Sequence, residues 1–455
     1  MLINPVHIRT GSPCGLNFVQ IGKVATPPNV RLAACLQRSA PIGPKNNHCL
    51  KGAAKLRKIR FHFGAMRRTF LNETLLPAGA RAYPEIGPPS KNSPPAPRKR
   101  NRTSVLQLVH SNEGGGVEAL AEMISDGLQR TGADVETRFI YPGISATTAQ
   151  KLRGIAAAIV AIARKRPDTL IAYQSTASVL VGVVGAAIGC KTRIVHQTAT
   201  PGEIHPAVRV LDTAMGSAGL YSVNIANSAA TEQAFGRYPQ PYRKYLRRID
   251  HGLDAPEARH PRSDVLARYA IPDDGLLLLN AGRLCDQKGQ DQIIRALPHV
   301  RGARLILAGG GPDEASLGEL ARSLGVADRI HFLGVVSREA LGDLLGAVDM
   351  FVFPSKWETF GLAAVEAAMA GVPIVAADLA VLREVLSTGR EEPVGFVDPT
   401  HPEALAAAIE KQRAWKRSSE AIRKFAQAIQ AKYSRSRMLE SYAELINGPE
   451  YRHAS

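Results

Sequence analysis

Two glutamates with a helix start between them are the residues in this sequence best placed to do chemistry. Glu358 lies in a polar stretch just before a predicted helix, and Glu366 falls about two turns later. The first backbone N–H groups of a helix have no partner within the helix, so they attract anions. Here those groups belong to Thr359, Phe360, Gly361 and Leu362. A carboxylate on each side of such an anion site suits a ligand with hydroxyl groups around a phosphate.

The stretch that holds these residues reads as a strand, a loop, a helix and a second strand. Met350–Phe353 is fully apolar, as a strand buried on both faces requires. Gly361–Ala370 is rich in alanine and predicts a helix. Gly371 and Pro373 should end that helix, because glycine favours the position after a helix and proline cannot continue one.

A second stretch offers two cations. Leu276–Leu279 predicts another buried strand, and Arg283 and Lys288 follow it within the segment AGRLCDQKG. Arginine presents a planar fork of donors and lysine a mobile point charge, and both suit a diphosphate. The simple alternative is an ordinary surface arginine and lysine, which the pairing with the glutamate stretch argues against.

The two stretches together resemble a known family. PSKWETFGLAAVEAAMAGVPIVA (residues 354–376) resembles the donor-binding signature of the retaining glycosyltransferases of family 4, and AGRLCDQKG resembles that family's Gly-Arg-Leu-x-x-x-Lys-Gly. The resemblance spans about Thr103 to Ile446 and is denser in the C-terminal part. It implies the GT-B fold, an α/β architecture of two Rossmann-like domains facing across a cleft. The expected domains are an acceptor domain (103–254), a donor domain (255–430) and a C-terminal segment with a helix that crosses back (431–455).

The resemblance also implies a reaction. A sugar would move from a nucleotide-diphosphate sugar to a hydroxyl acceptor with retained anomeric configuration. Arg283 and Lys288 would stabilise the diphosphate together with the helix start at residues 359–362. Glu358 would orient the sugar hydroxyls, and Glu366 would hold the ribose. No metal is expected, because the sequence shows no Asp-x-Asp motif in the turns that would form the cleft, and no cofactor is expected beside the donor substrate.

The N-terminal half supplies weaker signals. A glycine loop at residues 112–116 follows a predicted strand, and the resemblance implies that Gly115 and Gly116 let the backbone approach the donor diphosphate. A plain tight turn is the alternative. His196 directly follows another predicted strand, at the edge where open α/β sheets bind ligands. The resemblance implies that His196 contacts the donor sugar; a surface or core histidine is the alternative.

The partners follow from the same resemblance. The acceptor is expected to be a glycan or lipid-linked glycan in polysaccharide, lipopolysaccharide or glycolipid biosynthesis. A cytoplasmic location is expected, with peripheral contact at the inner face of the membrane as a further hypothesis. Residues 237–248 carry five basic side chains and three tyrosines, which indicate either a solvated loop or a contact with an anionic acceptor or a lipid surface.

Residues 1–102 read as a basic, proline-rich extension rather than as a domain. Residues 1–100 contain 17 of the chain's 57 Lys and Arg but only two of its 40 Asp and Glu, and residues 77–97 contain seven prolines. Plain disorder or a translation start further downstream is favoured; a targeting peptide and a nucleic-acid-binding arm remain as alternatives. The rest of the chain is close to neutral, so nucleic acid is not an expected partner.

Two other classes of protein share parts of this pattern. A pseudoenzyme that binds sugar nucleotides without transfer would need broken donor residues, and these are intact. A cofactor-dependent sugar phosphorylase shares the fold, but no convincing cofactor-lysine motif is present. The five cysteines show no Cys-x-x-Cys spacing, so neither a zinc site nor a disulfide framework is implied.

Overall fold

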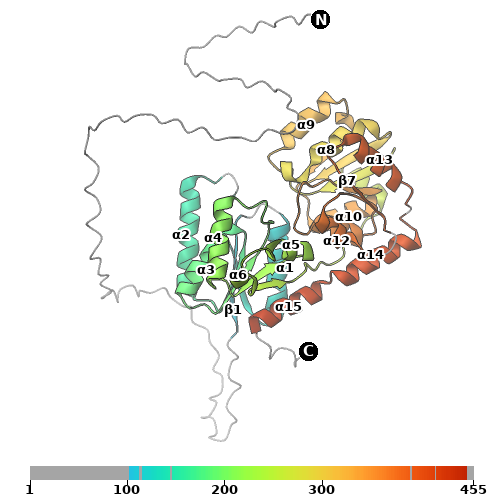
Figure 1. Ribbon diagram of the computed structural model, residues 1–455. Helices are drawn as coiled ribbons and strands as arrows, with labels where there is room; N and C mark the ends of the chain where they lie inside the picture. Colours follow the sequence, from blue (N-terminus) through green and yellow to red (C-terminus); the bar gives the residue numbers. More distant parts are fainter. Residues whose placement is uncertain (1–101, 112–114, 144–145, 390–391, 416, 448–455) are drawn as a thin grey trace, which may run out of the picture. The chain divides into compact units, whose positions relative to one another are not determined.

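The protein is described here by a computed structural model. It describes residues 102–111, 115–143, 146–389, 392–415 and 417–447. Nearly all of the expected extension and most of the glycine loop therefore lie outside the described residues. Within them the chain forms two six-stranded parallel sheets, in the orders β2-β1-β3-β4-β5-β6 and β12-β11-β10-β7-β8-β9 (Figure 1). The predicted α/β class with two Rossmann-like halves is confirmed.

The first half alternates strands and helices. Its strands are β1 (Ser104–Val109), β2 (Asp134–Phe139), β3 (Thr169–Tyr173), β4 (Thr192–His196), β5 (Val223–Ala226) and β6 (Leu246–Arg248). Its helices are α1 (Gly116–Arg130), α2 (Thr148–Lys165), α3 (Ser175–Ala187), α4 (Pro206–Ser217), α5 (Ala229–Phe235) and α6 (Gln240–Arg243).

Alternate side chains of β1 enter two separate cores. Val105 and Val109 pack with α1 and with Tyr442 near the end of the chain. Leu106 and Leu108 pack with α2, α3 and α4. Because successive side chains of a strand point to opposite faces, α2 to α4 cover one face of the first sheet and α1 covers the other.

The second half repeats the plan. Its strands are β7 (Leu276–Ala281), β8 (Ala303–Ala308), β9 (Ile330–Gly334), β10 (Met350–Phe353), β11 (Ile374–Ala377) and β12 (Val394–Val397). Its helices are α7 (Arg262–Arg268), α8 (Gln290–Ala296), α9 (Glu314–Ser323), α10 (Arg338–Ala347), α11 (Leu362–Met369), α12 (Ala380–Leu386), α13 (Pro402–Gln412) and α14 (Glu420–Lys432). The apolar runs at β7 and β10 are buried on both faces, as predicted.

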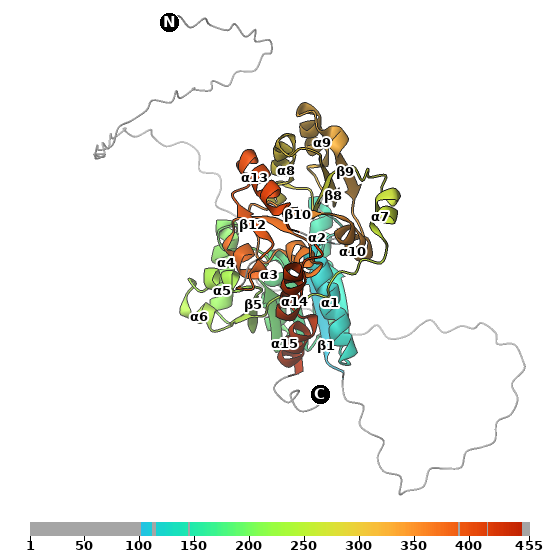
Figure 2. The same cartoon turned by 90° about the vertical axis from the view of Figure 1, so that its right-hand side faces the viewer.

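The chain crosses between the halves twice, and the two crossings touch. The Leu253 N–H donates to the carbonyl of Tyr433 (2.9 Å). A Cβ on Gly252 would lie 2.4 Å from the Ser434 carbonyl oxygen, so only glycine allows this approach. The last helix, α15 (Arg435–Asn447), then packs against α1 of the first half (Figure 2).

Candidate active site

A cavity with a volume of about 1040 Å³ is lined by residues of both halves. Its walls come from the segments that follow the carboxyl ends of the strands. In the first half they include His110 after β1 and Thr198 after β4. In the second half they include Gly282 after β7, Gly309 after β8 and Glu358 after β10. Parallel sheets bind their ligands at this edge, so the position of the cavity alone marks it as the candidate site.

Two loops of the second half meet at a glycine. Gly289 ends the loop after β7 with a positive φ of 65°, and a Cβ there would lie 2.4 Å from the Pro354 carbonyl oxygen. The Lys356 N–H donates to the Gln287 carbonyl (2.8 Å), which ties the same loops together. The close approach explains how residues about 70 positions apart come to share one site.

The structure pairs two of the predicted site residues with each other. Lys288 Nζ lies 2.5 Å from Glu358 Oε1, and both side chains are largely shielded from solvent. Lys288 Nζ also lies 5.4 Å from the centroid of the Phe353 ring. The Arg283 guanidinium, in contrast, is exposed on the cavity wall and makes no hydrogen bond or ion pair within the described residues. The site thus presents one neutralised cation and one cation available to an anion.

The start of α11 is shaped by two glycines. Gly361 has a φ of 87°, which glycine adopts easily, and it turns the chain from the loop into the helix. Gly116 of the first half lies against the same helix start, because a Cβ there would be 2.8 Å from Leu362 Cδ1. Gly115, Gly116 and the helix start all line the cavity, so the expected donor-binding backbone groups lie together.

Glu366 lines the cavity from the second turn of α11. Burial raises its pKa to about 6, and the positive charge of Arg338 lowers it only in part. The Glu366 carboxylate makes no hydrogen bond to any other described residue. A half-buried carboxylate without a hydrogen-bonded partner is available to accept hydrogen bonds from a ligand's hydroxyl groups.

Two cavity residues that were not predicted as site residues, Asn227 and His251, lie beside the predicted residue Thr359. The Asn227 side-chain amide donates to Thr359 Oγ1 (3.0 Å) and lies 3.1 Å from His251 Nε2. Burial lowers the pKa of His251 to about 4, so the ring is neutral near pH 7. Neither Asn227 Oδ1 nor His251 Nδ1 has a hydrogen-bond partner among the described residues.

His196 is buried between two tyrosines. Its ring lies between Tyr173 (centroids 4.5 Å apart) and Tyr442 (5.7 Å) and is only 3% exposed. The Tyr442 hydroxyl lies 3.0 Å from His196 Nε2. Burial lowers the pKa of His196 to about 3, with a smaller effect from His251. His196 is not among the residues that line the cavity. Its observed contact is with Tyr442 of α15, and the expected contact with the donor sugar stays a prediction.

A carboxylate of the second half holds the first half beside the cavity. Glu384 of α12 accepts hydrogen bonds from the Ala229 and Ala230 N–H groups, both at 2.7 Å. These groups open α5, where a negative charge is favourable. Ser228, the residue before α5, donates to the Thr359 carbonyl (2.8 Å), so the same contact reaches the cavity wall.

The basic segment 237–248 is not the solvated loop that was the first interpretation. It forms α6 and the edge strand β6. Tyr242 is buried, and its hydroxyl donates to Asp212 (2.8 Å). The tyrosine therefore anchors the segment, while Arg243, Lys244 and Arg247 stay exposed.

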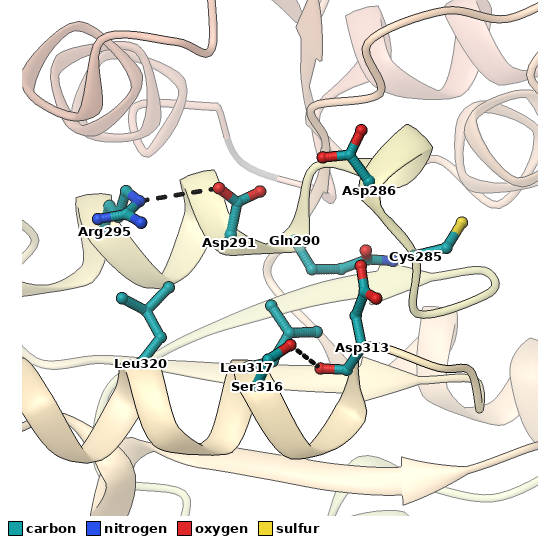
Figure 3. Close-up of a pocket in the computed structure, with 9 residues that line it drawn as sticks. All are labelled: Cys285, Asp286, Gln290, Asp291, Arg295, Asp313, Ser316, Leu317 and Leu320. Atoms are coloured by element: carbon teal, nitrogen blue, oxygen red, sulfur yellow. Dashed lines mark hydrogen bonds and ion pairs between the residues drawn. The ribbon is translucent and has the colours of Figure 1, made fainter. Parts of the chain in front are cut away.

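A smaller pocket of about 210 Å³ lies between α8 and α9 (Figure 3). Asp286, Asp291 and Asp313 line it, but Arg295 lies 3.7 Å from Asp291 and no basic group there is available to bind a phosphate. Among the described residues, no group of three or more His, Cys, Asp or Glu is arranged to hold a metal ion. The larger cavity is therefore the candidate active site.

The arrangement of the two halves is that of the GT-B class. Residues 262–428 match the family described as glycosyl transferases group 1. The crystal structure of Anabaena HepE in complex with UDP and glucose has a TM-score of 0.63 at 21% identity, over 76% of this chain and 100% of that chain. A sucrose-phosphate synthase from Thermosynechococcus elongatus has the same TM-score at 19% identity, over 78% and 100%.

Curated relatives match only in part. An uncharacterized glycosyltransferase of Methanocaldococcus jannaschii is 35% identical over 145 residues, 31% of this chain and 36% of that protein. A D-inositol 3-phosphate glycosyltransferase of Streptomyces avermitilis is 31% identical over 200 residues, 41% and 42% of the two chains. Each match thus covers about two fifths or less of the relative's own length. None of the described helices is long and apolar enough to cross a membrane.

Proposed function

We propose that the protein is a glycosyltransferase that moves a sugar from a nucleotide-diphosphate sugar to a hydroxyl acceptor. The observation that carries the proposal is the content of one cavity. The cavity is lined by Arg283, Lys288, Glu358, Glu366 and the start of α11, together with Gly115 and Gly116 of the first half. These groups match the parts of such a donor in charge and hydrogen-bonding capacity: two phosphates, a ribose and a sugar.

Each group has a role in the proposed reaction. The bond between the sugar's anomeric carbon and the phosphate oxygen breaks, and the nucleoside diphosphate leaves with the bonding electrons. Arg283, Lys288 and the N–H groups at the start of α11 stabilise this developing charge, and we propose that they do so without a metal. The acceptor oxygen attacks the face that the leaving group vacates, and its proton passes to the departing phosphate, so the anomeric configuration is retained.

The ion pair between Lys288 and Glu358 adds a step to this scheme. A diphosphate that approaches Lys288 competes with Glu358 for the ammonium group, because the two lie 2.5 Å apart without donor. Once the phosphate holds Lys288, Glu358 can accept hydrogen bonds from the sugar hydroxyls. Donor binding would thus free the carboxylate that orients the sugar.

The acceptor is proposed on broader grounds. The first half supplies the opposite wall, including His110, Gln174 and Thr198. One protein of similar fold, with a TM-score of 0.58 at 16% identity, is the glycosyltransferase WaaG of lipopolysaccharide biosynthesis. We therefore propose a glycan or lipid-linked glycan acceptor in the synthesis of a cell-surface polysaccharide, lipopolysaccharide or glycolipid.

A panel of sugar nucleotides tests the proposal. The protein is incubated with UDP-, GDP-, ADP- and dTDP-linked hexoses, with and without EDTA, and release of the nucleoside diphosphate is measured. We expect one donor to be hydrolysed or transferred, EDTA to have no effect, and NMR to show a product with the donor's anomeric configuration. A folded protein that releases no nucleoside diphosphate from any donor would contradict transfer, and a product of inverted configuration would contradict the retaining mechanism.

A further inference from the structure

The charged side chains that line the cavity are divided between its two walls. The lysines and arginines among the described lining residues are Arg283, Lys288 and Arg338, and all belong to the second half. The lining residues of the first half, from His110 to Leu253, are called here the acceptor wall, because they lie on the side proposed for the acceptor. The described part of the acceptor wall contains three carboxylates but no lysine or arginine.

The two histidines of the acceptor wall do not supply a positive charge either. Burial lowers the pKa of His110 and that of His251 to about 4, so both rings are neutral near pH 7. His110 Nε2 accepts a hydrogen bond from the Thr176 N–H (3.2 Å), so this nitrogen carries no proton. A phosphate or carboxylate placed against the described part of the acceptor wall would therefore meet no cation of the first half.

The three carboxylates follow one side of α1. Glu118, Glu122 and Asp126 recur every four residues and all line the cavity. Their row extends about 12 Å along the helix, which is longer than one sugar ring. The row starts near α11, because a Cβ on Gly116 would lie 2.8 Å from Leu362 Cδ1. A negative charge in the first turn stabilises a helix, which accounts for Glu118 but not for the two carboxylates further along.

The acceptor wall also offers groups that suit a sugar. Phe139 is 42% exposed and lines the cavity, so the C–H face of a sugar ring can pack against its aromatic ring. Asn227 and His251 are 4% and 6% exposed, yet Asn227 Oδ1 and His251 Nδ1 have no hydrogen-bond partner among the described residues. Buried polar atoms are ordinarily hydrogen-bonded. A ligand hydroxyl group, which both donates and accepts, can bond to either atom.

We propose that the acceptor is a saccharide whose part inside the cavity carries no phosphate or carboxylate group. This inference rests on the proposed transfer and adds the charge of its acceptor. An anionic group at the acceptor wall would be repelled by the three carboxylates, and such repulsion is one way in which a site excludes a wrong partner. Hydroxyl groups would instead donate hydrogen bonds to the same carboxylates. A lipid-linked acceptor fits only if its phosphates lie outside the cavity.

Acceptors that differ only in an anionic group test the proposal. The full-length protein is incubated with the donor from which it releases nucleoside diphosphate, and with glucose or glucose 6-phosphate, galactose or galacturonate, and N-acetylglucosamine or its 6-phosphate. We expect kcat/KM to be at least about tenfold higher for the neutral member of a pair, with a smaller difference at high salt concentration. Transfer that favours an anionic member would overturn this inference and leave the proposed function intact. Absence of release from every donor would contradict the proposed function itself.

Reversing the charge of the acceptor wall gives the matched variant. Glu122→Lys combined with Asp126→Lys should reduce the preference for the neutral member about tenfold. Glu319→Lys, at an exposed position on α9, is the control and should leave the preference unchanged. An unchanged preference in the double variant, with nucleoside diphosphate affinity retained as evidence of folding, would show that the carboxylates do not select the acceptor and would overturn the proposal.

A cysteine probe measures the charge of the acceptor wall without any acceptor. Ser125 lines the cavity beside the carboxylates, and Ser323 is exposed on α9. Full-length Ser125→Cys and Ser323→Cys are labelled with a cationic and with an anionic methanethiosulfonate, and the wild-type reaction of the native cysteines is subtracted. We expect the ratio of cationic to anionic labelling rates to be about tenfold higher at position 125 than at position 323. Equal ratios, or faster anionic labelling at position 125, would overturn the proposal.

Discussion

Replacing Glu366 by glutamine should stabilise the fold and weaken the site at the same time. The folded pKa of about 6 lies above the ordinary value of 4.5. Folding therefore favours the protonated carboxyl, and ionisation at neutral pH costs stability. At 1.36 kcal/mol for each pKa unit, the cost is at most about 2 kcal/mol at pH 7.5, and the neighbouring charge of Arg338 is already included in the folded pKa.

Because the pKa of Glu366 is raised on folding, the stability cost depends on pH in a defined range. The cost is fully present above the folded pKa and disappears as the pH falls from about 6 toward 4.5. Glu366→Gln should accordingly be more stable than wild type at pH 7.5 and lose this advantage near pH 4.5. Urea unfolding followed by tryptophan fluorescence reports on the second half, because both native tryptophans, Trp357 and Trp415, lie there. Glu403→Gln, an exposed glutamate on α13, is the matched control and should show no such change.

Binding should move in the opposite direction. The ribose hydroxyls donate to an ionised carboxylate, so nucleoside diphosphate affinity of the wild type should rise between about pH 5 and 6.5, and Glu366→Gln should bind more weakly throughout with a flatter pH profile. A variant that is no more stable at pH 7.5, yet binds nucleotide normally, would refute both the burial of the charge and its role in the site.

Three further outcomes are expected. Arg283→Ala should lower turnover about a hundredfold, which corresponds to a loss of about 3 kcal/mol of transition-state stabilisation. The control variant Arg301→Ala, at an exposed surface position, should have wild-type turnover. Equal turnover in the two variants would show that Arg283 does not take part in the reaction. Gly252→Ala should destabilise the protein, because the new Cβ would lie 2.4 Å from the Ser434 carbonyl oxygen. The control Gly318→Ala on α9, where a Cβ would have no atom within 4 Å, should be neutral or slightly stabilising. Similar melting temperatures for the two variants would argue against close contact between the two segments that cross between the halves. Glu384→Gln should weaken the hydrogen bonds to the start of α5 and reduce kcat/KM, and the control Glu403→Gln should leave kcat/KM unchanged. An unchanged kcat/KM in Glu384→Gln would show that this contact does not affect the reaction.

The sequence predicted the parts whose signals are local. β7 and β10 are apolar runs that only a sheet covered on both sides can bury, and Gly371 and Pro373 end α11 where the helix should stop. The residues proposed to bind phosphate could be picked out in the sequence because charge and a helix start combine within short segments.

The remainder depends on partners that are distant in sequence. His196 carries the signal of a strand-end ligand, but Tyr442, 246 residues away, encloses it. The Lys288–Glu358 pair and the Asn227–Thr359 contact form only after two loops or two halves meet. The strand β6 has a basic, unpatterned sequence and is held as an edge strand by the anchoring of Tyr242. Such features arise from tertiary packing, which overrides local propensity.

Calorimetric titration of the nucleoside diphosphates is the measurement that tests the central claim most directly. The diphosphate has phosphates and a ribose but no sugar. If the cavity is the donor site, one nucleoside diphosphate should bind the wild type, and Glu366→Ala should lose affinity about tenfold or more. Glu358→Ala should keep that affinity or bind slightly more tightly, because its loss releases Lys288 for the phosphates. Equal losses in the two folded variants, or no binding of any nucleoside diphosphate to the wild type, would contradict the account.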